Sequence, residues 1–417
     1  MPETLESTVE GTNETVGIRS LLISVYFPTL LFSVGFGAIV PVIALRAVDD
    51  LDATVAFAAF VVGLRGIGTM LFDVPAGVLI GRIGERYALT LASIALVGVA
   101  AVVAFSSSPW VYAGAIFVMG CALSVWMLAR LSYISEKVAV ERRGRALSLM
   151  GGTQRLGNVI GPVLGGFIGV ALGLEYVFWF FAALSVAGST VMLFSLGATS
   201  EEALDGEESV YRRIAGVVVD HRGIFATAGV ASICLQVMRA GRQAVIPLWG
   251  SAIGMDAAEI GLVFTLSSVF DVALFYPVGV VMDRYGRKWT GVPCLAVVAV
   301  SMLLIPLTET AMMLIAVGVL SGLGNGLGSG INMTLGADFA PPGNRGEFLG
   351  VWRLVGDIGT ASGPIVISAI TGVATLGVAS VATGGIGIAG ALIFAFLVPE
   401  PLYYRATKRD PARAAGP

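Results

Sequence analysis

Charged residues are scarce in this sequence. Only 13% of its 417 residues are charged, and 56% are hydrophobic, whereas a soluble domain usually carries about a quarter charged residues. This composition argues against the roughly two or three soluble domains that the length alone would suggest. The formal net charge of −3 is also too small to indicate nucleic acid or an anionic surface as a partner.

Histidine, lysine and cysteine are rare as well. The one histidine, His221, lies in a polar segment, so histidine proton relays, zinc-protease motifs and serine–histidine triads are excluded. Lys137, Lys288 and Lys408 all lie outside the apolar runs, which excludes a retinal Schiff base, and no Walker A lysine motif points to ATP as an energy source. The cysteines stand far apart and are interpreted as packing residues. We therefore expect no enzyme, no metal site and no bound cofactor.

Apolar sequence, in contrast, is abundant. A transmembrane helix needs roughly 20 mainly apolar residues, and runs of that length recur from one end of the chain to the other. They predict an all-α polytopic membrane protein with twelve spans, over residues 20–44, 53–80, 88–106, 110–132, 146–171, 174–197, 223–250, 258–282, 289–307, 311–337, 347–373 and 376–398. The glycine-rich segment 322–330 falls inside the tenth span, so we interpret it as a place of helix packing or bending and not as a nucleotide loop.

The longest polar segment divides the chain into two parts. Residues 198–222 are predicted to link a six-helix bundle over 20–197 to a second one over 223–398, with polar tails at 1–19 and 399–417. The first seventeen residues carry no basic segment and no cleavage site, so we expect no secretory signal peptide. Outside the spans, lysine and arginine gather on one side, and the opposite loops hold only Arg46. This bias places both termini in the cytoplasm.

The second part repeats the first at a nearly fixed offset. Pro75, Gly77, Arg82 and Gly84 return 202 residues later as Pro277, Gly279, Arg284 and Gly286. At the same offset, Gly157 and Gly161-Pro162 correspond to Gly359 and Gly363-Pro364. Chance does not align glycine and proline in this way across separate segments, so the two bundles are predicted to be structurally related.

The second copy of the repeated loop fits the pattern G-x-x-x-D-R-x-G-R-[RK] throughout. It comprises Gly279, Asp283, Arg284, Gly286, Arg287 and Lys288, and it resembles the loop signature of the major facilitator superfamily (MFS) of secondary transporters. The first copy keeps Gly77, Arg82, Gly84 and Arg86 but has Gly81 in place of the acid. The resemblance extends from Ser20 to Val398 and implies the MFS fold, with two six-helix bundles related by a pseudo-twofold axis.

The resemblance also implies a role for these loops, which in the family latch the two halves together on the cytoplasmic side. Because Gly81 replaces the acid, we expect a weaker latch in the first half. In the alternative interpretation, the motif supplies only topology-setting charges and glycines that allow close helix approach. The resemblance further favours a monomer.

Six ionisable residues inside the spans form a candidate gating and coupling set, because a charge at the bilayer midplane costs roughly 2.5–3.5 kcal/mol. At about 1.5 Å per residue, Asp73 lies level with Arg353, and Arg155 lies level with Asp271. The resemblance implies that spans two and eleven, and spans five and eight, face each other. We therefore expect two ion pairs between the halves, and a third pair, less well matched in depth, between Arg65 and Asp357. In the alternative interpretation, Asp73 or Asp271 carries a proton.

A candidate substrate cavity is predicted around the seventh span, which the resemblance implies lines the centre of the fold. Arg239 and Arg242 stand three residues apart and share a helix face. The other polar or aromatic candidates are Gln236, Gln243, Asn325, Asn332, Ser33, Trp126 and Arg130. This set favours a polar or anionic substrate. Alternatively, the two arginines only bind backbone carbonyls or a nearby acid.

These observations predict a secondary active transporter in the cytoplasmic membrane, working by alternating access. Its expected partners are a small organic substrate, protons and the lipid bilayer. On the resemblance we expect proton-coupled export of the drug or metabolite efflux type. The alternatives are uptake or exchange of an organic anion or sugar and, more remotely, a membrane sensor that keeps the fold without transport.

Overall fold

The computed structural model describes residues 21–138, 140–195, 216–341 and 345–400, and within these ranges the chain is helical and forms no strand. The first half contains η1 Leu22–Tyr26, α2 Phe27–Asp49, α3 Val55–Phe105, α4 Pro109–Lys137, α5 Val140–Ala171 and α6 Leu174–Ser195. The second half contains α8 Arg222–Ile224, η2 Phe225–Gly229, α9 Val230–Ala252, α10 Ala257–Tyr285, α11 Lys288–Leu304, η3 Ile305–Leu307, α12 Ala311–Leu327, α13 Ile331–Phe339, α14 Arg345–Thr371 and α15 Leu376–Phe396.

The predicted all-α polytopic fold is confirmed, and each of the twelve predicted spans overlaps a described helix. Ten helices in the described ranges are long and apolar enough to cross a membrane. Helix α3 is one of them, and it comprises the second and third predicted spans, which a non-helical kink at Gly84 separates. Helix α5 is not among the ten, and it carries Arg155 and Asn158 towards the other half of the molecule. The predicted linker and both tails lie largely outside the described residues, and residues 216–220 near the end of that linker are helical.

The chain reverses direction at equivalent glycines in the two halves. Gly84 has a φ angle of 76° and Gly286 a φ angle of 109°, a region of backbone conformation that side chains disfavour sterically. Both belong to the repeated loop, between the second and third spans and between the eighth and ninth. The repeat seen in the sequence therefore reflects a shared backbone requirement.

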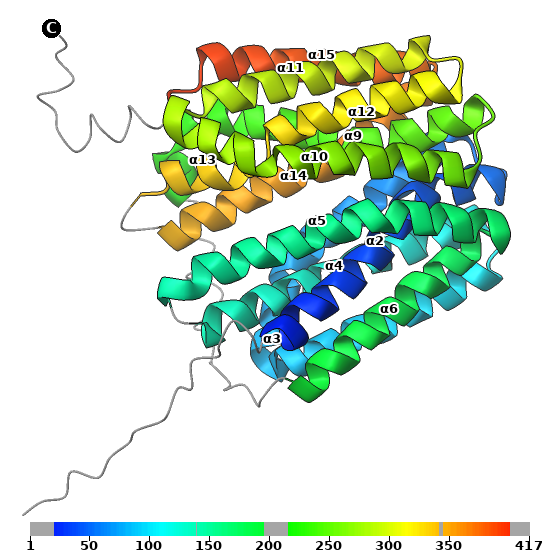
Figure 1. The fold of residues 1–417 in the computed structure, drawn as a ribbon, viewed down its shortest axis with the longest axis horizontal. Helices are drawn as coiled ribbons and strands as arrows, with labels where there is room; N and C mark the ends of the chain where they lie inside the picture. Colours follow the sequence, from blue (N-terminus) through cyan, green and yellow to red (C-terminus); the bar gives the residue numbers. More distant parts are fainter. Residues whose placement is uncertain (1–20, 139, 196–215, 342–344, 401–417) are drawn as a thin grey trace, which may run out of the picture.

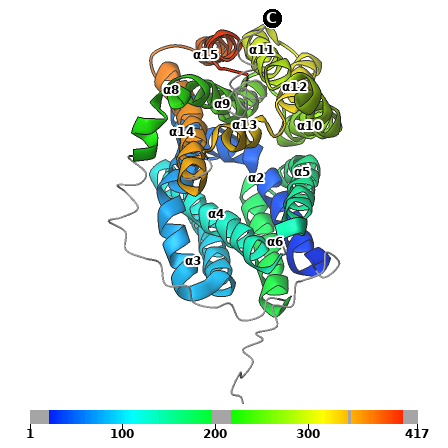
Figure 2. The same ribbon diagram turned by 90° about the vertical axis from the view of Figure 1, so that its left-hand side faces the viewer.

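Helix pairings repeat between the halves in the same way. In the first half α2 packs against α5 and α6, and α3 packs against α4; in the second half α9 packs against α14 and α15, and α10 packs against α12. Figures 1 and 2 show the resulting bodies, α2 to α6 below and α9 to α15 above. The order of helices and their neighbours is thus common to both bundles.

The repeated glycines lie where these helix pairs touch. A Cβ added at Gly161 would collide with the Val34 carbonyl of α2, and one added at Gly363 would collide with the Val237 carbonyl of α9. Because only a glycine lets two backbones approach so closely, the sequence repeat marks the same helix contact in each bundle. The predicted bend in the tenth span is also present: Gly330, with a φ angle of 78°, separates α12 from α13.

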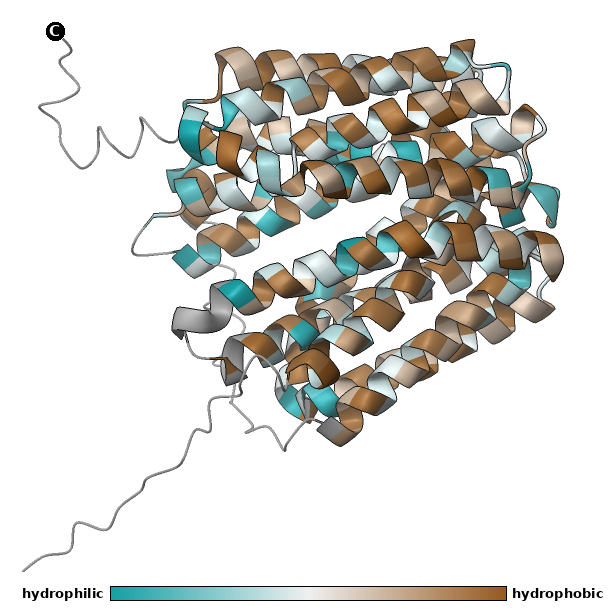
Figure 3. Cartoon of the chain, viewed as in Figure 1, coloured by the Kyte–Doolittle hydropathy of each residue, from teal (hydrophilic) through white to brown (hydrophobic). Residues whose placement is uncertain are grey.

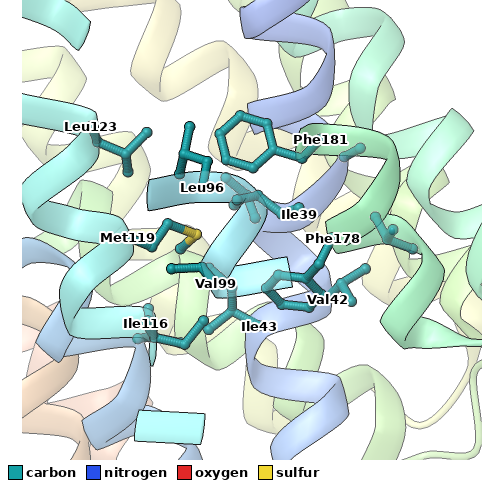
Figure 4. Close-up of a cluster of buried hydrophobic side chains, with 14 of the residues drawn as sticks. Ile39, Val42, Ile43, Leu96, Val99, Ile116, Met119, Leu123, Phe178 and Phe181 are labelled. Atoms are coloured by element: carbon teal, nitrogen blue, oxygen red, sulfur yellow. The ribbon is translucent and has the colours of Figure 1, made fainter. Parts of the chain in front are cut away.

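The interior of the first bundle is a continuous apolar core. Ile39 and Ile43 of α2 pack with residues of α3, α4 and α6, including Leu96, Ile116 and Phe178, as Figure 4 shows. Figure 3 shows hydrophobic residues over most of both bundles, with hydrophilic ones mainly at helix ends and along the helices where the bundles meet. Apolar packing therefore holds each bundle together, and polar chemistry concentrates between them.

The two bundles meet along α5–α10 and α3–α14. We call the end of the molecule that bears the repeated loops 82–87 and 283–288 the signature end, and the end that bears the loops around 50–54 and 253–256 the opposite end. At the opposite end Ser251 donates a hydrogen bond to Asp49 over 2.9 Å, and a Cβ added at Gly166 would lie 2.5 Å from the Ala257 carbonyl oxygen. The opposite end is therefore closed by direct contact.

Candidate functional site

A cavity of about 240 Å³ lies between the two bundles. The first bundle contributes residues from α2 and α5, and the second contributes residues from α9, α10 and the α12–α13 segment. Its lining comprises Phe36, Gly37, Val40, Arg155, Asn158, Pro162, Arg239, Arg242, Gln243, Phe264, Ser268, Asp271, Val272, Asn325 and Gly330. Polar groups therefore face the cavity together with aromatic and aliphatic side chains.

Four of the predicted cavity residues lie in this lining, namely Arg239, Arg242, Gln243 and Asn325. Arg239 donates from Nη2 to the Gly328 carbonyl over 3.0 Å and from Nη1 to Gln236 Oε1 over 3.3 Å. Arg242 donates from Nη1 to Ser321 Oγ over 3.2 Å and to Ser267 Oγ over 3.4 Å. The partners of both guanidinium groups are neutral.

The other predicted residues on α9, α13 and α2 lie outside the lining of this cavity. Gln236 donates to Thr360 Oγ1 over 3.3 Å, and Asn332 accepts hydrogen bonds from Ser232 at its side chain and from Trp352 at its carbonyl. Ser33 is buried in the α2–α5 contact, where a Cβ on Gly157 would strike it. These residues lie on the expected spans, but their side chains point away from the cavity lining.

Trp126 and Arg130 of α4 are also placed elsewhere, inside the first bundle. Trp126 stacks on Phe32 with ring centroids 3.5 Å apart. The Arg130 guanidinium lies over the Trp126 ring, 4.1 Å from its centroid, and donates to Thr29 Oγ1 over 3.1 Å. This arrangement is a buried cation–π contact, away from the cavity.

The two ion pairs expected between the bundles are present. Arg155 Nη1 of α5 lies 3.1 Å from Asp271 Oδ2 of α10, and Asp271 also accepts a hydrogen bond from Ser329 Oγ over 3.1 Å. Arg353 Nη2 of α14 lies 3.3 Å from Asp73 Oδ2 of α3. The gating role of these pairs stays a prediction.

The third expected pair is wrong. Arg65 donates from Nη2 to Gln243 Oε1 over 2.6 Å instead of reaching Asp357. Arg65 precedes Asp73 by about two helical turns, whereas Asp357 follows Arg353 by about one, so the two side chains lie at different depths. Asp357 instead lies 3.6 Å from Arg353 Nε and beside Asp73, which makes two carboxylates share one guanidinium.

The second signature loop is bound within its own bundle. Arg287 Nε lies 2.7 Å from Asp338 Oδ2 of α13, and the backbone amides of Arg287 and Lys288 donate to the Glu400 carboxylate over 2.9 and 3.1 Å. Asp283 is largely exposed and lies 3.7 Å from Arg287. In the first loop, Glu85 is buried and accepts a hydrogen bond from Ser132 Oγ over 2.9 Å. These contacts of each loop lie within one bundle, and the latch between the halves stays a prediction.

Several residues of the site were not predicted from the sequence. Ser124 of α4 donates to Asp73, and Glu400 holds the second loop. Asn158 and Ser268 line the cavity. A signal existed for Asn158, because it follows Arg155 by three residues and so shares its helix face. Within the described ranges, no cluster of three or more histidine, cysteine, aspartate or glutamate residues is suited to a metal ion.

Two bundles with repeated helix pairings, a cavity between them and closure at one end define the fold of a membrane carrier. Comparison with known proteins agrees: the family model of the Major Facilitator Superfamily matches residues 25–239 and 228–415. The chain belongs to this family. It is a multi-pass membrane protein of a transporter family, which indicates transport of a small molecule and not catalysis.

Similar proteins include named transporters of bacteria. The chain is 24% identical over 333 residues to the multidrug resistance protein MdtH of Klebsiella pneumoniae (strain 342), covering 78% of this chain and 80% of that protein. It is 23% identical over 334 residues to the inner membrane transport protein YajR of Escherichia coli (strain K12), covering 79% of this chain and 72% of that protein.

Solved structures show the same fold. The crystal structure of a POT family transporter in complex with a thioalcohol-conjugated peptide matches with a TM-score of 0.75 at 12% identity, covering 90% of this chain and 95% of that one. The crystal structure of a D-xylose-proton symporter matches with a TM-score of 0.70 at 15% identity, covering 92% and 98%. At these identities the likeness concerns the fold alone.

Proposed function

We propose that this protein is a proton-coupled secondary transporter that exports a small organic solute across the cytoplasmic membrane by alternating access. The observation that carries the proposal is the cavity between the bundles, which direct contacts close at the opposite end. A carrier needs such an arrangement because its binding site must open to one side at a time. The resemblance to MdtH supports export.

The lysine and arginine bias supports an orientation with the signature end and both termini in the cytoplasm. In this orientation the structure represents the inward-facing state, in which the cavity receives solute from the cytoplasm. Release on the other side then requires that the Asp49–Ser251 contact separate and that the signature loops approach each other. We propose that one copy of the chain performs this cycle alone.

The ion pairs between the bundles support a role in coupling. In the α3–α14 contact, Asp73 and Asp357 share the single cation Arg353, so the three groups carry a net negative charge when both acids are ionised. A proton binding to one acid neutralises the cluster, because neighbouring like charges favour protonation. Movement of α14 relative to α3 changes how closely Arg353 lies to the two acids, which links proton binding to the movement of the bundles. Asp271, paired with Arg155, is the second candidate.

Reconstitution in liposomes tests this function. Purified full-length protein is placed in liposomes that contain a pH-sensitive dye, and phthalate, D-xylose or benzyltrimethylammonium is added under an imposed pH gradient. We expect at least one probe to cause proton flux that protein-free liposomes lack. If a probe binds the protein but neither it nor protons cross the membrane, the chain is a sensor with this fold and the proposal is wrong.

A further inference from the structure

The cavity carries more positive charge than its acids neutralise. Arg239, Arg242 and Arg155 all line it, whereas the one acid among the described lining residues, Asp271, is bound to Arg155. Arg65 reaches the same region from the first bundle, where it donates to Gln243 Oε1 over 2.6 Å. Resting on the transporter function proposed above, we infer that the cargo bound in this cavity is a small organic anion.

The acidic partners of other arginines in the same molecule can be compared with those of Arg239 and Arg242. Arg155 and Arg353 lie inside the spans and each has a carboxylate within 3.3 Å. Arg287 at the signature end has one at 2.7 Å, and Arg46 at the opposite end has one at 2.8 Å. Each of these four arginines has an acid beside it, whereas Arg65 and Arg130 donate to Gln243 and Thr29, which are neutral. Arg239 and Arg242 form no ion pair with any described carboxylate, although they are partly buried.

Neutral hydrogen bonds hold the two cavity arginines in place without balancing their charge. The Arg242 contacts to the Ser321 and Ser267 hydroxyls span 3.2 and 3.4 Å, at and beyond the long end of the range of N–H···O bonds. A carboxylate or sulfonate forms shorter, charge-assisted bonds and can engage a guanidinium with two oxygens. An anion entering the cavity therefore replaces weak contacts with stronger ones.

The remaining lining residues of the cavity favour an organic anion with an apolar part over a simple inorganic anion. Phe36 and Phe264 contribute aromatic surface, and Val40 and Val272 contribute aliphatic surface. A fully hydrated inorganic anion gains nothing from these groups, whereas an aromatic or aliphatic acid buries apolar area against them. The volume of about 240 Å³ limits the ligand to a small molecule.

Thermal denaturation of the full-length protein in detergent tests this inference without measuring transport. The probes share one ring size and differ in charge: benzenesulfonate and phthalate are anions, benzamide is neutral, and benzyltrimethylammonium is a cation. Sodium sulfate serves as the inorganic anion at equal ionic strength. At concentrations about 100-fold above the Kd, we expect an organic anion to raise the Tm by about 3–6 °C, and the other probes to leave it unchanged.

Three variants locate the effect. Arg239→Gln with Arg242→Gln should abolish the shift, whereas Arg222→Gln, which removes one exposed positive charge at the start of α8, should keep it in full. Arg239→Lys with Arg242→Lys, used if the glutamine variant does not fold, should keep the charge but lose the two-oxygen contact and retain only part of the shift.

The outcomes separate this inference from the proposed function. Stabilisation by the neutral or cationic probe, an equal effect of sulfate, or an anion shift that survives in the glutamine variant would each overturn the organic-anion assignment. If benzyltrimethylammonium alone drove proton flux, the transporter function would stand and the organic-anion assignment would be wrong. Binding of the organic anions without any flux would support the organic-anion assignment and contradict the transporter function.

Discussion

Two environments surround the arginines in the interior of this molecule. Arg155 and Arg353 bridge the bundles to acids, while Arg65 and Arg130 rest against Gln243, Thr29 and aromatic rings. A charge in the middle of a membrane costs roughly 2.5–3.5 kcal/mol on insertion scales, so either arrangement must serve a purpose. The paired arginines can exchange partners when the bundles move, and exchanging the two charges tests this.

Charge exchange at the α3–α14 pair is the first prediction. Asp73→Asn and Arg353→Gln should each lower transport by at least about tenfold, since a barrier rise of about 1.4 kcal/mol gives that factor. Asp73→Asn removes the acid that joins Arg353 to the other bundle, and Arg353→Gln leaves Asp73 and Asp357 without the cation that they share. The double variant Asp73→Arg with Arg353→Asp should recover part of the rate, measured as flux in proteoliposomes at matched protein content. Failure of the exchanged pair to exceed both single variants would contradict the pairing role.

A second residue-scale prediction concerns the Arg155–Asp271 pair. A double-mutant cycle with Arg155→Gln and Asp271→Asn should give an interaction energy of about 0.5–3 kcal/mol in unfolding stability, because both side chains are more than three-quarters buried. Detergent-solubilised protein unfolded by heat or denaturant supplies the measurement. Additive effects of the two substitutions would show that the 3.1 Å contact between α5 and α10 contributes nothing to unfolding stability.

The two ion pairs were predictable from the sequence, but Arg65 and Trp126 were not placed correctly. The family resemblance implied which spans face each other, and the rise of 1.5 Å per residue gave the depth of each acid and base. The direction of a side chain around its helix depends on tertiary packing. Trp126 stacks on Phe32 inside the first bundle and does not face the cavity, and its position along the span does not determine this direction.

At the scale of helices, glycine sets how closely the helices within each bundle pack. Gly157 and Gly161 bring α5 against α2, and Gly359 and Gly363 bring α14 against α9. The spans themselves were predictable because a bilayer demands long apolar helices. The break at Gly84 between the second and third spans, both of which lie in α3, also falls in the predicted gap between residues 80 and 88.

Helix packing supplies a matched test with one substitution at two sites. Gly161→Ala places a methyl group against the Val34 carbonyl and should destabilise the protein by about 1–3 kcal/mol, the usual cost of overpacking. Gly98→Ala on α3 meets nothing within 4 Å and should be neutral or stabilise by up to about 1 kcal/mol, because alanine is the better helix former. Thermal unfolding of both variants checks the difference, and equal melting temperatures would contradict the close α2–α5 contact.

At the scale of the whole molecule, the bundles act as two bodies joined at the opposite end. Ser251 and Asp49 touch there across the seam, and Thr265 of α10 donates to the Val159 carbonyl of α5 over 2.9 Å. Alternating access requires that these contacts break while the helices within each bundle stay packed. The internal repeat predicted two bundles, but which end was closed could not be read from the sequence, since both states use the same chain.

Crosslinking across the opposite end tests this movement. With the three native cysteines replaced by alanine, Asp49→Cys and Ser251→Cys are joined by a short, cleavable thiol crosslinker. Transport should fall to the level of protein-free liposomes and return after reduction, because the cavity can no longer open on that side. Each single-cysteine variant, treated identically, should transport normally. Undiminished flux in the crosslinked double variant would show that this end does not open during the cycle.

Closure at the Asp49–Ser251 end has a pharmacological consequence. If the signature end lies in the cytoplasm, a blocker that binds Arg239 and Arg242 can enter the cavity only from the cytoplasmic side. A hydrophilic blocker added to the medium around intact cells can then bind only after the opposite end opens during the transport cycle. In inverted vesicles the cytoplasmic side faces the medium, so the blocker reaches the same guanidinium groups directly. Screens on whole cells would overlook compounds that screens on inverted vesicles detect.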